Sequence, residues 1–168
     1  MNGGWPRFIV DREDGNLPRI YVDADACPVK QEVCKVARRY GLAVTFVSNS
    51  RMGIPDPGIS TLVVVDGGFD AADDWIVGQV STDDIVVTAD IPLAHRCIGR
   101  RARVIGPTGR LFTEENIGQA MAMRELMSDL RDSGTITGGP PPFQKRDRSR
   151  FLHGLDQMIQ AINHQRLH

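Results

Sequence analysis

The chain of 168 residues is long enough for one domain with a single substantial core. Its content of 41% hydrophobic and 24% charged residues is ordinary for a soluble globular protein, and a net charge of -1 excludes a generally basic nucleic-acid binder. The sequence has no apolar stretch of the length that a signal peptide or a membrane span needs, so we expect a cytoplasmic protein without a membrane partner.

Short β-branched runs alternate with amphipathic stretches after an N-terminal extension, residues 1–18, which shows little periodicity and is predicted to be partly disordered. Alternation with short connections predicts one domain, residues 19–168, with a three-layer α/β/α architecture around a mostly parallel sheet of about five strands. Strands are predicted at 20–23, 42–47, 62–65, 85–88 and 103–105, and helices at 28–41, 70–80, 91–100, 114–131 and through a final segment around 151–162.

The last third of the chain supplies C-terminal helices. The helix at 114–131 carries five apolar side chains at a spacing typical of core positions: Met121, Met123, Leu126, Met127 and Leu130. A Gly- and Pro-rich stretch, 134–143, follows it. The apolar face of the final amphipathic helix is expected to pack on the sheet or on a neighbouring subunit. The sequence therefore leaves open whether the protein forms a homo-oligomer.

Cysteine usage fits a reducing compartment. Cys27, Cys34 and Cys97 form no C-x-x-C pair, and we expect free thiols. Cys27 stands near the start of a predicted helix, where the pKa of a nucleophilic thiol would be lowered. It has no histidine nearby in the sequence, so we favour a packing role for it.

Charge is distributed unevenly along the sequence. Residues 52–94 hold eight aspartates and no Lys or Arg, whereas residues 95–110 hold five arginines and no acid, and a second basic run covers 145–150. Each run alone is typical of a solvated surface. Together they suit an acidic pocket rimmed by arginines, which would act on a phosphate-bearing substrate.

Aspartates follow three of the predicted strands. Asp23 and Asp25 come after the first strand, and Asp90 after the fourth. Open α/β sheets bind ligands beyond the carboxyl ends of their strands, so these side chains are expected to lie near one another. A third acidic group, which contains Asp73 and Asp74, opens the helix after the third strand. Like charges brought together need a compensating cation, so a divalent-metal site is the first hypothesis.

Helix capping is the alternative explanation for single acids. Asp90 and Asp70 stand where N-caps belong, and Asp90 could serve as both cap and ligand. Capping does not explain the pairs, Asp23 with Asp25 and Asp73 with Asp74. Residues 83–84, also a pair of aspartates, precede a strand and are expected to form an exposed turn at the opposite edge of the sheet.

The cluster favours Mg²⁺ or Mn²⁺ over zinc because it offers hard oxygen ligands, and we assign no metal to the four histidines. An ion held by carboxylates can lower the pKa of a bound water and offset charge on a phosphoryl group. Four basic residues near the acids are predicted to contact substrate phosphates: Lys30, Arg96, Arg100 and Arg101.

Several sequence blocks carry a resemblance to a known family. They are 21–30 (Tyr-Val-Asp-Ala-Asp-Ala-Cys-Pro-Val-Lys), 68–75 (Gly-Phe-Asp-Ala-Ala-Asp-Asp-Trp), 88–94 (Thr-Ala-Asp-Ile-Pro-Leu-Ala) and 138–143 (Gly-Gly-Pro-Pro-Pro-Phe). Residues 116–118 and Met123-Arg124 fit as well. From about Ile20 to its C-terminus, the chain resembles the YaiI/YqxD family of bacterial proteins, which is grouped with PIN-like domains.

The resemblance implies a PIN-like fold, whose members are often Mg²⁺- or Mn²⁺-dependent ribonucleases with acids at strand ends. Asp23 then resembles the first-strand aspartate and Asp90 the later one, while Asp73 or Asp74 supplies the middle acid. We predict a metal-dependent nuclease, acting on RNA rather than DNA. Its catalytic and metal-binding acids would be Asp23, Asp25, Asp74 and Asp90, with Asp73 as a further metal ligand and Asp70 in reserve.

Two other functions stay open. Asp23-x-Asp25 after an apolar strand resembles the first motif of haloacid-dehalogenase-like phosphatases, in which one Asp attacks phosphorus. Ala26-Cys27 then stands where that motif usually has Thr or Val. The other alternative is a nucleotide- or RNA-binding module that needs a metal but does not catalyse a reaction on its ligand.

Overall fold

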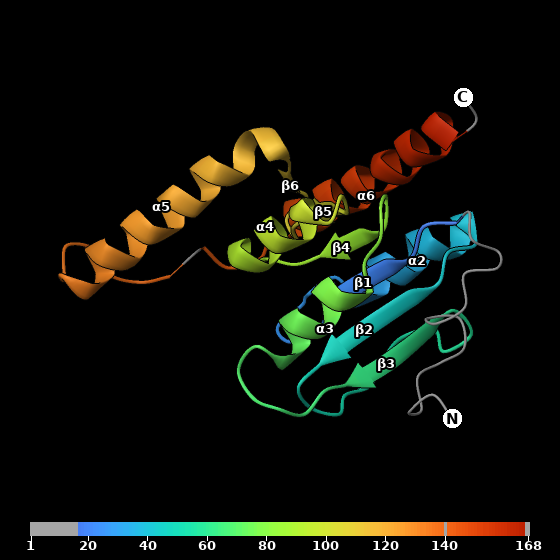
Figure 1. Ribbon diagram of the computed structural model, residues 1–168, viewed down its shortest axis with the longest axis horizontal. Coiled ribbons are helices and arrows are strands. Elements are labelled where there is room, and N and C mark those ends of the chain that lie inside the picture. Colours follow the sequence, from blue (N-terminus) through green and yellow to red (C-terminus); the bar gives the residue numbers. More distant parts are fainter. Residues whose placement is uncertain (1–16, 140, 167–168) are drawn as a thin grey trace.

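The computed structural model describes residues 17–139 and 141–166, so most of the predicted N-terminal extension lies outside the described residues. Strands and helices alternate through most of the first two-thirds of the chain, with no helix in the described residues between β2 and β3 or between β5 and β6 (Figure 1). The elements are β1 (Ile20–Asp23), α2 (Lys30–Tyr40), β2 (Val44–Ser48), β3 (Ser60–Val64), α3 (Ala71–Gln79), β4 (Ile85–Val87), α4 (Ile91–Gly99), β5 (Arg103–Ile105), β6 (Leu111–Phe112), α5 (Glu114–Asp132) and α6 (Lys145–Arg166).

The six strands form one sheet in the order β3-β2-β1-β4-β5-β6. All neighbours pair in parallel except β5 and β6, which are antiparallel, with Ile105 opposite Leu111. The α/β architecture expected from the sequence is confirmed, with one more strand than expected. The sequence analysis missed β6 because two residues are too few to show an alternating pattern.

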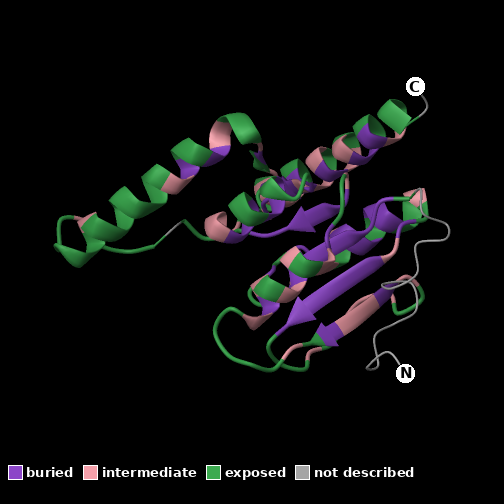
Figure 2. Cartoon of the chain, viewed as in Figure 1, coloured by how far each residue is buried: buried purple, intermediate pink, exposed green. Residues whose placement is uncertain are grey.

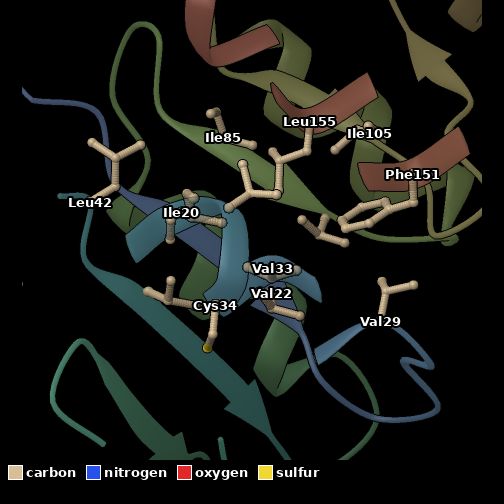
Figure 3. Close-up of a cluster of buried hydrophobic side chains, with 14 of the residues drawn as sticks. Ile20, Val22, Val29, Val33, Cys34, Leu42, Ile85, Ile105, Phe151 and Leu155 are labelled. Atoms are coloured by element: carbon tan, nitrogen blue, oxygen red, sulfur yellow. The ribbon is translucent and has the colours of Figure 1, made fainter. Parts of the chain in front are cut away.

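Alternate strand residues pack into two separate cores. Ile20 and Val22 of β1 belong to the core beneath α2 and α6, which Figure 3 shows, whereas Tyr21 belongs to the core beneath α3, α4 and α5. Phe151 and Leu155 of α6 are fully buried against the first of these cores. The helices therefore cover both faces of the sheet, as the period of two in a strand requires.

Helix α5 extends from the domain as an arm, and most of it is exposed (Figure 2). Its first turns pack through Ile117 and Ala120. The expectation that its later apolar residues are core is wrong for three of them, since Met123 is 49%, Leu126 50% and Met127 38% exposed. Met123 and Met127 instead line a cleft that Ile136 and Phe143 also border.

The turn before β4 also differs from expectation, because Asp84 is 1% exposed. Its carboxylate accepts hydrogen bonds from the backbone N–H groups of Arg19, at 3.0 Å, and Ser81, at 2.9 Å. These bonds tie together the segments that lead into β1 and β4, which is why the acid is buried. Asp83 pairs with Arg103 at 3.1 Å.

In the described part of the chain, none of the helices combines the length and the apolar character that crossing a membrane would require.

Candidate functional site

The sheet changes its winding direction between β1 and β4. The chain runs outward from β1 to β2 and β3, then crosses back through α3 to β4 on the other side of β1. In open α/β sheets the carboxyl ends of the two strands at such a switch point flank a crevice that binds ligands. Asp23 is the last residue of β1, and Asp90 lies three residues beyond the end of β4, so both stand at this position.

The hydroxyl of Thr88 connects these two acids. It donates a hydrogen bond to Asp23 Oδ2 at 2.9 Å and accepts one from the backbone N–H of Asp90 at 3.0 Å. Asp90 is the N-cap of α4, as the sequence predicts, because its Oδ1 accepts from the backbone N–H of Leu93 at 3.0 Å. One oxygen of each carboxylate, Asp23 Oδ1 and Asp90 Oδ2, accepts no hydrogen bond from the described residues.

Asp73 of α3 is the third acid of the group. The edge-on contact of Trp75 with Tyr21, 6.0 Å between ring centroids, packs α3 against the face of β1 toward which alternation directs Asp23. Burial, followed by the charges of Asp90, Asp23 and Asp70, raises the pKa of Asp73 to about 6. Burial, together with Asp90 and Asp25, also raises the pKa of Asp23, against the lowering effect of the Thr88 hydrogen bond.

Asp74, the other candidate for the middle acid, is engaged elsewhere. It is exposed and pairs with Arg96 of α4, Oδ1 to Nη1, at 2.9 Å. Asp70 occupies the N-cap position of α3 and makes no capping hydrogen bond through its side chain. Successive residues of a helix point in directions about 100° apart, so Asp73 and Asp74 cannot both face Asp23.

Asp25 follows the end of β1 and turns toward β2. Its Oδ1 accepts from the hydroxyl of Ser48 at 2.8 Å, and its Oδ2 from the backbone N–H of Asn49 at 3.0 Å. The strand ends at Asp23, so the strand geometry that would direct Asp23 and Asp25 to one ion is not present. Asp25 still lines the same cleft as Asp23 and Asp90.

A divalent ion is the ligand that the donor set suits, although within residues 17–139 and 141–166 no three His, Cys, Asp or Glu side chains are close enough to hold one ion as they stand. Asp23, Asp73 and Asp90 offer hard oxygen ligands, and none of them forms an ion pair with a described residue. Asp23 and Asp90 each have one carboxylate oxygen that accepts no hydrogen bond from the described residues and could bind an ion. Binding of one ion by all three acids would therefore require them to move closer together.

The cleft that Asp23, Asp25 and Asp90 line, which we call the acid cleft, has a volume of about 480 Å³. Two arginines of α5 also line it. Arg124 and Arg131 are seven residues apart, which places them on one face of the helix, and both reach the cleft that holds Asp23 and Asp90. The sequence analysis did not select them. Two features of the sequence could have indicated them. Arg124 belongs to one of the family-like blocks, and its spacing of seven residues from Arg131 places both on one face of a helix.

The basic residues that the sequence analysis selected lie outside the lining of this cleft. Lys30 donates from Nζ to the backbone oxygen of Cys27 at 3.0 Å. Arg96 pairs with Asp74, and Arg100 reaches the backbone oxygen of Val80 at 3.5 Å. Arg101 lines a different hollow, beside β5 and β6.

The three cysteines are buried and free, in agreement with the sequence analysis. Burial raises the pKa of the Cys27 thiol, which is the opposite of what an activated nucleophile needs. Cys27 borders the acid cleft as part of its apolar wall.

Comparison with known protein families shows which family the chain belongs to. Residues 21–161 match the protein family described as "Uncharacterized BCR, YaiI/YqxD family". The chain belongs to this family. The match spans all strands and helices except the two ends of the domain, and the YaiI/YqxD assignment confirms the resemblance found in the sequence.

Relatives in this family are closely similar over most of their length. The chain is 54% identical to a UPF0178 protein of Paramagnetospirillum magneticum over 143 residues, which are 85% of the chain and 95% of the relative. It is 53% identical to a UPF0178 protein of Bradyrhizobium over 147 residues, 88% of the chain and 90% of the relative. A UPF0178 protein of Agrobacterium fabrum is 52% identical over 145 residues, 86% and 95% of the two chains. No solved structure matches the chain.

Proposed function

We propose that Asp23, Asp73 and Asp90 hold a divalent cation, Mg²⁺ or Mn²⁺, and that the protein hydrolyses a phosphodiester bond of RNA. The observation that carries this proposal is the placement of Asp23 and Asp90 together at the switch point of the sheet, linked by Thr88, with Asp73 near enough for both charges to raise its pKa. The Asp90 charge contributes to the raised pKa of Asp23, the Asp90 and Asp23 charges contribute to the raised pKa of Asp73, and no arginine or lysine forms an ion pair with the three acids among the described residues. PIN-like nucleases, which the sequence resembles, carry acids at the same strand ends.

The residues around the acids have separate roles. Thr88 orients Asp23 and the backbone of Asp90, while α4 fixes the Asp90 side chain through its capping bond. Arg124 and Arg131 would bind substrate phosphates through bidentate hydrogen bonds. A bound Mg²⁺ or Mn²⁺ would supply an activated water and offset negative charge at phosphorus.

The phosphatase alternative has weaker support. It requires Asp23 and Asp25 to act on one phosphorus atom, whereas both oxygens of Asp25 accept hydrogen bonds from Ser48 and Asn49. Binding without turnover differs from our proposal only in the absence of cleavage, so an activity assay separates the two.

The assay follows cleavage of a labelled single-stranded RNA, and of DNA of the same sequence, with millimolar Mn²⁺ or with EDTA. Asp90→Asn should abolish cleavage while the protein stays folded, because an Asn side chain still caps a helix. The matched control is Asp83→Asn, at the opposite edge of the sheet, where the residue has φ 68° and Asn is well tolerated. Equal cleavage by the two variants, or no cleavage by the wild-type protein, would contradict the proposal.

A further inference from the structure

A second hollow, of about 610 Å³, lies between the turn at 106–110 and the first turns of α6. Three exposed arginines contribute to its lining: Arg110, Arg146 and Arg150. None of them forms an ion pair with another described residue. The lining contains one acid, Asp147, whose Oδ2 accepts from the backbone N–H of Gln144 at 2.9 Å. The basic hollow thus holds an excess of positive charge.

The wall of the basic hollow is built by close backbone contact. Gly109 has φ +89°, and a Cβ atom there would lie 2.8 Å from the backbone carbon and oxygen of Arg150. Only glycine permits this approach. The contact holds the turn against α6 and so fixes Arg110 and Arg150 on the same hollow.

A third cleft lies between the basic hollow and the acid cleft and shares lining residues with each of them. This middle cleft of about 830 Å³, which α5, residues 136–139, Pro141 and Phe143 help to line, shares Arg110 with the basic hollow. At its other end it shares Arg124 and Arg131 with the acid cleft. Its lining is mainly apolar and includes Met123, Met127, Ile136 and Phe143.

We infer that the basic hollow binds a second phosphate group of the same nucleic-acid strand whose scissile phosphate lies at the acid cleft. The inference rests on the proposed function and deepens it. Apolar side chains in the middle cleft can contact the faces of bases, which are accessible only in an unpaired strand. Arginine is the residue that binds phosphate oxygens in pairs, and three guanidinium groups here have no carboxylate partner in the described chain.

The test measures binding without metal, so that it does not depend on cleavage. Fluorescence anisotropy with a labelled short oligouridylate in EDTA compares the wild-type protein with Arg146→Gln/Arg150→Gln. The control, Lys35→Gln/Arg166→Gln, removes the same charge from exposed positions outside the hollow. We expect Kd to rise about tenfold in the first variant only, and the dependence of log Kd on log salt to fall by about 0.7 for each lost phosphate contact.

Each result decides the inference. If both double variants bind the oligouridylate equally more weakly than the wild-type protein, the arginines act only through overall charge and the inference is overturned. A wild-type protein that does not bind the oligouridylate would also overturn the inference. If binding depends on Arg146 and Arg150 while nothing is cleaved with Mn²⁺, the subsite stands and the catalytic proposal fails. If Asp90→Asn abolishes cleavage while the arginine variant binds and cleaves like the wild-type protein, the subsite fails and the catalytic proposal stands.

Discussion

Thr88 donates a hydrogen bond from its hydroxyl to Asp23 Oδ2 at 2.9 Å, across the boundary between β1 and β4. The same hydroxyl accepts the backbone N–H of Asp90 at 3.0 Å, and Thr88 is 2% exposed. Two of the three acids of the candidate site, Asp23 and Asp90, are therefore linked by one buried side chain.

Thr88→Val should destabilise the fold by roughly 1–2 kcal/mol, because it leaves a partly buried carboxylate and a backbone N–H without this partner. Urea unfolding measures the change in the free energy of unfolding. Thr45→Val is the matched control, because the Thr45 hydroxyl is buried and has no hydrogen-bond partner in the described chain. A control variant as destabilised as Thr88→Val would contradict the role given to the Thr88 bonds.

Asp73 and Asp74 make a second matched pair. Asp73→Asn should reduce Mn²⁺ affinity and RNA cleavage at least about tenfold, because it removes a charged ligand. Asp74→Asn breaks only an exposed ion pair with Arg96, worth about 0–1 kcal/mol of stability, and should change affinity little. Calorimetric Mn²⁺ titration of both variants checks this. A larger loss in Asp74→Asn would reverse the assignment.

The raised pKa of Asp73 predicts how stability depends on pH in the metal-free protein. The folded state binds the proton more tightly than the unfolded state, whose pKa is near 3.8. The stabilisation is thus complete below about pH 3.8 and is lost as pH rises through about 6. Asp73→Asn should remove this loss and raise stability at neutral pH by on the order of 1 kcal/mol after solvent screening. A wild-type slope that persists in the variant would contradict the assignment.

Leu155→Ala and Leu126→Ala test the two classes of apolar helix residue. Leu155 is fully buried on the inner face of α6, so its truncation should cost about 2–5 kcal/mol of unfolding free energy. Leu126 is 50% exposed on the α5 arm, so its truncation should cost less than about 0.5 kcal/mol. Thermal and urea unfolding of both variants provide the values. A large loss in Leu126→Ala would show that the arm is covered in solution.

The strands at 20–23 and 103–105 were predictable to the residue, because buried parallel strands appear as short β-branched runs with turn residues on both sides. The meeting of Asp23 with Asp90 followed from the parallel sheet alone. Which of Asp73 and Asp74 joins them depends on the rotation of α3 about its axis. The sequence of α3 does not define that rotation, since its apolar residues form no clear stripe.

The α5 arm shows a different limit of the sequence. Periodic apolar residues predict a helix and its apolar face correctly, but they do not say what covers that face. Met123 and Met127 line the middle cleft instead of the core, whereas Arg124 lines both the middle cleft and the acid cleft. These placements arise because α5 leaves the domain and residues 136–139 lie beside it. No local sequence pattern encodes this arrangement.

Mn²⁺ binding at the acids is the measurement that tests the account most directly. Isothermal titration calorimetry should show Mn²⁺ binding to the wild-type protein and to Asp83→Asn, with the affinity reduced at least about 100-fold in Asp23→Asn/Asp90→Asn, since two of the proposed charged ligands are lost. Equal affinity in the wild-type and double-variant proteins, or no heat of binding at millimolar Mn²⁺, would contradict the proposal that these carboxylates form a metal site.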